Sequence, residues 1–161
     1  MKNLILIMII AFLINSCEEK ECCVNIDVGI SISVVDSIGN DLLNPENPNS
    51  FSFEGIRIYD LVDGEKDLFY NGHLDSPRNI ALLDPRLDDK YRLGLIFNLT
   101  TGEYNTRFIQ WDDNIEDEFK VQFYRNNGNT TILKVWLNQE LVWDSDINSG
   151  IRDFTITRCD I

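Results

Sequence analysis

Strict two-residue alternation between residues 24 and 34 is the feature that most constrains the fold of this chain. Every even position is aliphatic, and the odd positions are polar residues or glycine. Side chains of a β-strand point alternately to opposite faces, so the pattern predicts a long strand with one buried and one wet face. Gly29 is the expected place for a bend or bulge. The expected core-facing set is Val24, Ile26, Val28, Ile30, Ile32 and Val34, and the expected solvent-facing set includes Asn25, Asp27, Ser31 and Ser33.

Similar short segments follow along the chain and are separated by turn signals. Asp63-Gly64, Thr101-Gly102 and residues 126–129 each divide two such segments, and Asp-Gly suits the tight turn of a hairpin. No window holds an apolar stripe at helical spacing, so we expect little helix. The pattern predicts an all-β fold, an antiparallel β-sandwich of immunoglobulin-like or related type with about nine or ten strands. Residues 24–161 are long enough to form it as a single domain.

The first residues of the chain have a different character. Lys2 is followed by an unbroken apolar run from Leu4 to Ile14, which is shorter than the roughly 20 residues that a membrane-spanning helix needs. A cationic start, a short apolar stretch and small residues at the exit predict a signal peptide over residues 1–16. The exit, Ile14-Asn15-Ser16-Cys17, resembles the lipobox of bacterial lipoproteins. That resemblance implies cleavage before Cys17, acylation of Cys17, and a tether formed by residues 17–23.

The tether suggests where the protein is located. Residues 18–21, Glu-Glu-Lys-Glu, resemble the short acidic export signals that direct some Gram-negative lipoproteins to the outer leaflet of the outer membrane. Several acyl chains bind a membrane firmly without any transmembrane helix. We therefore expect a lipid-anchored outer-membrane protein exposed at the cell surface, with the periplasmic face as the alternative.

Two further segments extend the resemblance. Residues 36–45, directly after the first long strand, and residues 134–143 are similar to segments of small uncharacterised β-sandwich lipoproteins of Gram-negative bacteria. In those proteins the C-terminal hairpin typically turns at Asn-Gly, whereas here Gln139 follows Asn138. The resemblance implies the fold and the location. Because that family has no assigned activity, the resemblance implies no chemistry.

Three cysteines remain if Cys17 is acylated. Exported proteins tolerate disulfides, and three thiols permit one intramolecular bridge. A bridge from Cys159 to Cys22 or Cys23 would join the two ends of the domain, and the alternative is three unpaired thiols.

Charge and residue counts exclude several functions. With 14 Lys and Arg against 27 Asp and Glu, the net charge of −13 speaks against a nucleic-acid partner. A single histidine, His73, leaves little material for a catalytic triad or a zinc site, so we expect no enzyme, metal or cofactor. Residues 144–150 resemble a calcium loop but depart from the EF-hand at two defining positions, which favours an ordinary turn. The acidic residues of 111–118 are expected to form a solvated connection.

The hairpin around Asn138-Gln139 provides the candidate binding residues. If those two residues form the turn, Leu137 lies opposite Glu140, Trp136 opposite Leu141, Val135 opposite Val142, and Lys134 opposite Trp143. Alternation then places Lys134, Trp136, Leu141 and Trp143 on one face, with Leu133, Val135, Leu137 and Val142 on the core face. Trp136 and Trp143 would form an aromatic surface, with Lys134 in a cation–π contact with Trp143. Two alternatives are a covering loop that buries both tryptophans, and a different register.

These observations favour a non-enzymatic lipoprotein whose β-sandwich binds a ligand or a partner at the outer membrane. Carbohydrate is the first ligand to test, because exposed aromatic side chains on a sandwich can stack against sugar rings. The alternative is a structural or assembly accessory of a cell-surface complex, in which another surface protein is the partner and no small molecule is bound.

Overall fold

The computed structural model describes residues 24–85, 89–99, 102–148 and 150–159. These residues form strands and turns, with no helix that could cross a membrane. The predicted all-β class is confirmed, with eleven strands in place of the expected nine or ten. The strands are β1 (Ile26–Asp27), β2 (Gly29–Asp36), β3 (Arg57–Val62), β4 (Glu65–Leu68), β5 (Ile80–Leu83), β6 (Arg92–Ile96), β7 (Tyr104–Gln110), β8 (Glu116–Asn126), β9 (Asn129–Leu137), β10 (Glu140–Asp144) and β11 (Asp153–Arg158).

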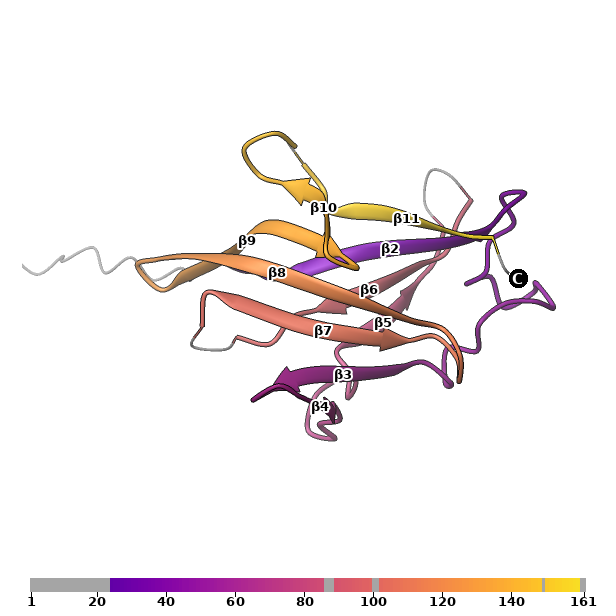
Figure 1. Ribbon diagram of the computed structural model, residues 1–161, viewed down its shortest axis with the longest axis horizontal. Coiled ribbons are helices and arrows are strands. Elements are labelled where there is room, and N and C mark those ends of the chain that lie inside the picture. Colours follow the sequence, from indigo (N-terminus) through magenta and orange to yellow (C-terminus); the bar gives the residue numbers. More distant parts are fainter. Residues whose placement is uncertain (1–23, 86–88, 100–101, 149, 160–161) are drawn as a thin grey trace, which may run out of the picture.

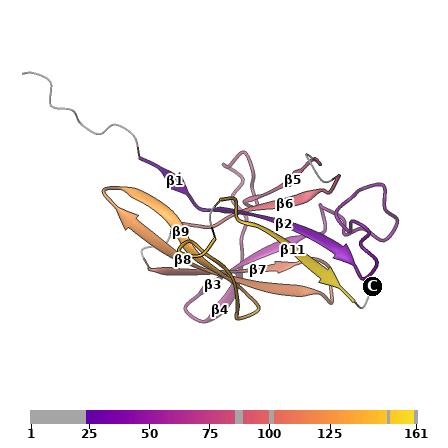
Figure 2. The ribbon, with the colours of Figure 1, turned by 90° about the horizontal axis from the view of Figure 1, so that it is seen from above.

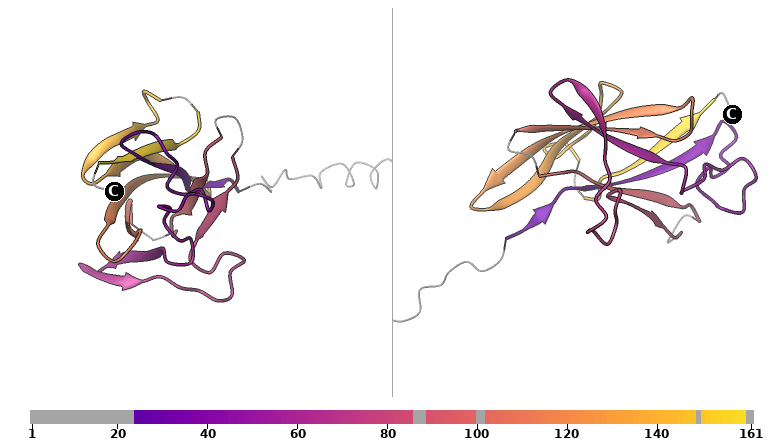
Figure 3. Two further views of the ribbon diagram at one scale, coloured as in Figure 1. Left: turned by 90° about the vertical axis from the view of Figure 1, so that its right-hand side faces the viewer. Right: turned by 90° about the horizontal axis from the view of Figure 1, so that it is seen from below.

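The strands form two sheets that lie face to face (Figures 1 and 3). The larger sheet has the order β1-β9-β8-β7-β3-β4, and β10 shares the outer edge of β9 with β1. The smaller sheet has the order β11-β2-β6-β5. This arrangement is consistent with a β-sandwich.

The sheets are mixed, which corrects the expectation of a purely antiparallel fold. β1 runs parallel to β9, and β11 runs parallel to β2. Hairpins join antiparallel neighbours, but parallel neighbours need a long crossover connection. Both parallel pairs join segments far apart in the sequence, so no local turn signal could indicate them.

The predicted first strand is divided in two at Val28, next to the glycine where a bend was expected. β1 belongs to the larger sheet and β2 to the smaller one. Ile30, Ile32 and Val34 are buried as predicted, but Val24 is 60% exposed and Ile26 53% exposed. The prediction is wrong for these two residues because β1 projects from the end of the molecule (Figure 2), where no second sheet covers it.

Ser33 departs from the pattern in the opposite sense. It was expected to face solvent, but it is only 2% exposed. Arg92 in β6 and Asp153 in β11 flank β2, and the Arg92 Nε lies 2.7 Å from the Asp153 Oδ2. By register both side chains lie on the outer face of the smaller sheet, so the ion pair spans β2 on the face to which Ser33 points.

The turns agree with their sequence signals. Asp63 and Gly64 have φ angles of 51° and 88°, and Asn127 and Gly128 have φ angles of 49° and 83°. Two consecutive positive φ angles are typical of the tight hairpin turn that matches the twist of its strands. One apolar core lies between the sheets and includes Ile30, Ile32, Val34, Ile58, Leu93, Leu95, Phe97, Ile109, Phe119, Val121, Phe123, Ile132 and Val135.

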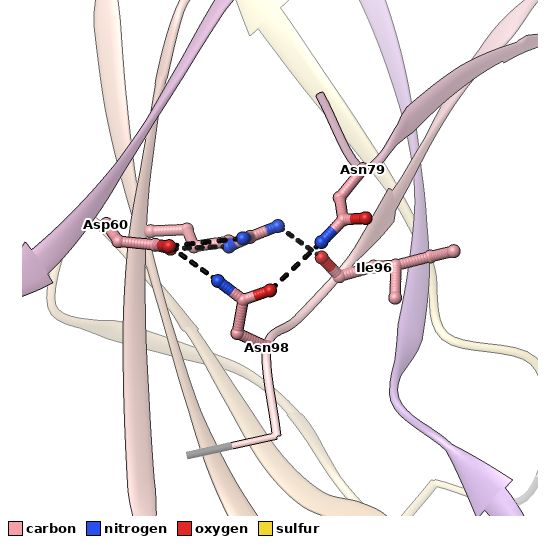
Figure 4. A network of polar contacts seen from close by, with 5 residues as sticks. Asp60, Asn79, Ile96 and Asn98 are labelled. Atoms are coloured by element: carbon pink, nitrogen blue, oxygen red, sulfur yellow. Dashed lines mark hydrogen bonds and ion pairs between the residues drawn. The ribbon is translucent and has the colours of Figure 1, made fainter. Parts of the chain in front are cut away.

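A fully buried arginine, Arg107, connects the two sheets inside this core. Figure 4 shows the network of Asp60, Asn79, Ile96 and Asn98 around it. Arg107 in β7 donates from Nε to the Asp60 carboxylate of β3 at 2.7 Å, and from Nη1 to the carbonyl oxygen of Ile96 in the smaller sheet. Asn98 donates to the same carboxylate at 2.5 Å and accepts from Asn79 at 3.0 Å. Burial lowers the pKa of Arg107, and the hydrogen bond and charge of Asp60 oppose that shift. The guanidinium is thus held as a cation by partners from both sheets.

Candidate functional site

The C-terminal hairpin turns where the sequence predicts, but its register changes halfway along. Glu140 pairs with Leu137 and Leu141 with Trp136, as expected. A β-bulge at Val142 then shifts the pairing, so that Trp143 lies opposite Val135 and Asp144 opposite Lys134. One extra residue on one strand reverses the faces of all residues that follow. Trp143 therefore points into the core and is 8% exposed.

The predicted surface of two tryptophans is consequently wrong. Trp143 lies beneath Arg152, whose guanidinium carbon is 5.4 Å from the centre of its ring. Lys134 does not contact Trp143; its ammonium lies 2.7 Å from the Asp144 carboxylate. Trp136 alone stays on the outer face of the larger sheet, where it is half-buried.

The ion pair of Lys134 and Asp144 has clear electrostatic consequences. The hydrogen bond from Lys134 lowers the pKa of Asp144 below its ordinary value of 3.8. The same hydrogen bond raises the pKa of Lys134 above 10.5. The Asp144 carboxylate also accepts from the backbone of Asp146, and Asn148 accepts from the backbone of Asp144. Residues 144–148 thus form the expected Asx turn, and the described residues contain no His, Cys, Asp and Glu group that could hold a metal.

Trp136 has two partners that the sequence analysis did not identify. Its ring centre lies 6.2 Å from that of Tyr104, with the two rings tilted by 52°. The Lys120 ammonium lies 4.7 Å from the centre of the Tyr104 ring and 5.9 Å from that of Trp136. We call these three residues the aromatic platform.

The register of the larger sheet explains how the platform forms. Lys120 in β8 pairs with Trp136 in β9, and Tyr104 in β7 pairs with Gln122, two residues further along β8. The two rings therefore approach each other diagonally across β8, with Lys120 beside both. The alternation of Phe119, Val121 and Phe123 could have placed Lys120 and Gln122 outward, but the strand order was needed to bring Tyr104 to them.

The platform is accessible and has polar groups at its border. Tyr104 is 45% exposed, and so is Leu141, which lies beside Trp136. Gln122 lies between Tyr104 and Lys134 in the next row and donates to the Glu103 carboxylate at 2.6 Å. The arrangement combines exposed ring surface with ammonium and amide groups. It can stack against a flat apolar ligand surface and hydrogen-bond the polar groups at the ligand's edge.

A groove of about 540 Å³ lies on the outer face of the smaller sheet. Its floor contains small residues from three adjacent strands, because Ser31, Gly94 and Ala81 lie side by side in β2, β6 and β5. Ile96 and Ile151, which are 49% and 86% exposed, contribute to its walls. The lining is mostly apolar, and its titratable side chains, Asp27 and Arg152, form an ion pair with each other.

The acidic segment 111–118 differs from the expected solvated connection. Asp117 is 2% exposed, and its carboxylate accepts from the Trp111 indole at 2.7 Å and from the Asn138 amide at 2.9 Å. It also pairs with Arg158 of β11. One carboxylate of the cluster is therefore a buried link between the sheets, because Asp117 falls on the inward position of β8.

The described residues include one of the four cysteines. Cys159 follows β11 and is exposed, whereas Cys17, Cys22 and Cys23 lie outside the described residues. Cys159 directly follows Arg158, which lies opposite Asp36 at the end of β2, and β1 lies at the other end of β2 (Figure 2). The bridge from Cys159 to Cys22 or Cys23 stays a prediction, and these positions do not favour it.

Comparison with known proteins adds no relative. No protein-family model matches the chain, and no similar curated protein or solved structure was found. The resemblance of residues 14–17, 36–45 and 134–143 to bacterial lipoproteins therefore stays a prediction.

Proposed function

We propose that this chain is an exported, lipid-anchored protein of the outer membrane that binds carbohydrate through the aromatic platform. Removal of residues 1–16 would leave Cys17 as the acylated first residue, with residues 17–23 as the tether. The domain that follows, of immunoglobulin-like or related type, presents the platform at the cell surface, or at the periplasmic face as the alternative. The function is binding and not catalysis.

The observation that carries this proposal is the contact between the exposed Tyr104 ring and the half-buried Trp136 ring beside Lys120. Binding sites for small molecules combine ring or apolar surface with a few well-placed polar groups that fix orientation. One face of a sugar ring is rich in C–H groups, which pack against aromatic rings. Its hydroxyls can bond to the ammonium of Lys120 and the amide of Gln122, both of which border the rings.

A glycan array probed with the full chain tests the platform. The chain is purified in an ethylene-oxide detergent, so that no sugar headgroup competes. We expect Trp136→Ala to lose the binding that the unchanged protein shows. Tyr70→Ala is the matched control, since Tyr70 is 69% exposed but lies outside the platform. Equal loss in both variants, or full binding by Trp136→Ala, would contradict the proposal.

The anchor is tested separately at Cys17. Replacing Cys17 by Ala removes the acceptor of the acyl chains, so the protein should accumulate unprocessed or as a soluble species. Partitioning of membrane and detergent fractions measures this. If Cys17→Ala still enters the detergent phase as a processed protein, the lipoprotein assignment is wrong.

The groove on the smaller sheet favours a second candidate, an assembly role in a cell-surface complex. Its apolar lining and the exposed Ile151 suit contact with another surface protein. Ala81→Leu would fill the floor of the groove without touching the platform. Loss of co-purifying surface proteins with unchanged glycan binding would support assembly, and unchanged co-purification would contradict it.

A further inference from the structure

We infer that the ligand of the aromatic platform is an acidic carbohydrate whose anionic group binds Lys120. This inference rests on the proposed function, because it specifies the chemistry of the sugar at the same site. It is carried by the difference between Lys120 and the two other lysines on the outer face of the larger sheet.

Those two lysines already have acidic partners. The Lys66 ammonium contacts the Phe108 ring at 4.0 Å and is paired with Glu116. Lys134 is paired with Asp144 at 2.7 Å. Lys120 lies against two rings, and within the described residues it forms no ion pair or hydrogen bond.

The position of Lys120 leaves its bonding capacity available. An ammonium has three N–H donors, and an aromatic ring attracts the charge without accepting a directed hydrogen bond as a carboxylate does. Among the three described lysines on the outer face of the larger sheet, Lys120 is the one without an acidic partner. A ligand carboxylate would form an ion pair with Lys120, as Glu116 does with Lys66 and Asp144 does with Lys134.

A single acidic sugar unit can contact both the aromatic rings and the ammonium of the platform. Its ring can stack on Trp136 or Tyr104, while a carboxylate attached to that ring reaches the ammonium beside them. A neutral sugar could stack equally well but would offer only hydroxyl oxygens to Lys120. Hydrogen bonds between charged groups are about twice as strong as neutral ones. The platform should therefore prefer the acid.

The test compares ligands that differ only in charge. Oligogalacturonates and their methyl esters present the same rings, with and without the carboxylate, and titration calorimetry measures their binding to the full chain in ethylene-oxide detergent. We expect the acid to bind about tenfold more tightly, which corresponds to about 1.4 kcal/mol. Lys120→Met should remove this preference, so that it binds acid and ester with equal, reduced affinity. Lys66→Met, the matched lysine variant on the same face, should keep the preference.

The outcomes separate this inference from the proposed function. Equal binding of acid and ester by the unchanged protein, or an acid preference that survives in Lys120→Met, overturns the inference and leaves carbohydrate binding intact. Absence of binding to every acidic and neutral sugar overturns both. If Lys120→Met binds neither ligand, Lys120→Arg, which keeps the positive charge, must still prefer the acid, and its failure to do so rejects the inference.

Discussion

The larger sheet holds a cation against an aromatic ring on each of its two faces. On the inner face the Arg107 guanidinium lies 4.5 Å from the centre of the Phe69 ring, and on the outer face the Lys120 ammonium lies 4.7 Å from that of Tyr104. Arg107 also bonds Asp60 and the carbonyl of Ile96, whereas Lys120 has no acidic partner among the described residues. The same kind of contact thus serves stability on one face. On the other face it leaves a cation available to a ligand.

The largest loss of stability should come from removing the Arg107 guanidinium on the inner face. Arg107→Met leaves the Asp60 carboxylate without its charged partner and the Ile96 carbonyl without its side-chain donor, so the free energy of unfolding should fall by about 3–5 kcal/mol. Urea denaturation followed by tryptophan fluorescence measures it. Lys66→Met is the control, because it breaks an exposed ion pair worth about 0–1 kcal/mol. Similar losses in both variants would show that the Arg107 network does not hold the sheets together.

The next largest difference in stability is expected between variants of the two tryptophans in the C-terminal hairpin. Trp143→Ala removes a ring that is only 8% exposed, so it should cost about 3 kcal/mol. Trp136→Ala removes a half-buried ring on the outer face and should cost about 1 kcal/mol, roughly what partial burial of an aromatic contributes. The same denaturation assay compares them. A larger cost at Trp136 than at Trp143 would contradict the bulge at Val142.

A smaller effect of opposite sign is expected at the turn of that hairpin. Gln139 has a φ of 72°, a conformation that costs residues other than glycine about 1–2 kcal/mol. Glycine also gives the unfolded chain more freedom, so Gln139→Gly should stabilise the fold by only about 0.5–1 kcal/mol. Thermal unfolding measures the gain. Asn138→Gly is the control and should destabilise, because the Asn138 side chain bonds the backbone of Glu118 and the carboxylate of Asp117.

The smallest effect concerns the pH dependence of the outer-face ion pair. The pKa of Asp144 is lowered, so its contribution to stability is present above 3.8 and is lost as the pH falls through the lower folded value. The pKa of Lys134 is raised, so its contribution is present below 10.5 and is lost as the pH rises through the higher folded value. Lys134→Met should therefore reduce the stability lost between neutral pH and about pH 3, as urea midpoints measure. An unchanged loss would contradict the pairing.

Sequence patterns predicted the individual strands and turns better than the pairing of strands within the sheets. The alternation of residues 24–34 identified the core face of β2, and Asp63-Gly64 identified its hairpin, because both signals are local. Val24 and Ile26 were assigned wrongly because the pattern does not show where the opposing sheet ends. The parallel pairing of β2 with β11 had no local signal, since the two strands are brought together only by the complete fold.

The candidate site also shows that local sequence signals do not reveal register changes or contacts between distant strands. Trp136 was placed on the outer face correctly, but the bulge at Val142 moved Trp143 to the core and gave Lys134 a carboxylate partner. Nothing in residues 140–144 marks the bulge in advance. Tyr104 and Lys120 were missed because their contact with Trp136 depends on the order of three strands.

The passage of the first strand from one sheet to the other has a mechanical consequence. A pull on Val24 acts along β1 and β2, which extend in one direction from that end of the molecule (Figure 2). β1 is bonded to β9, and β2 is bonded to both β11 and β6. Because the pull runs along these strands, their hydrogen bonds must shear together and cannot open one after another. The force that the domain withstands at this end therefore depends on the rate at which β1 and β2 separate from both sheets. It does not depend on the equilibrium free energy of unfolding.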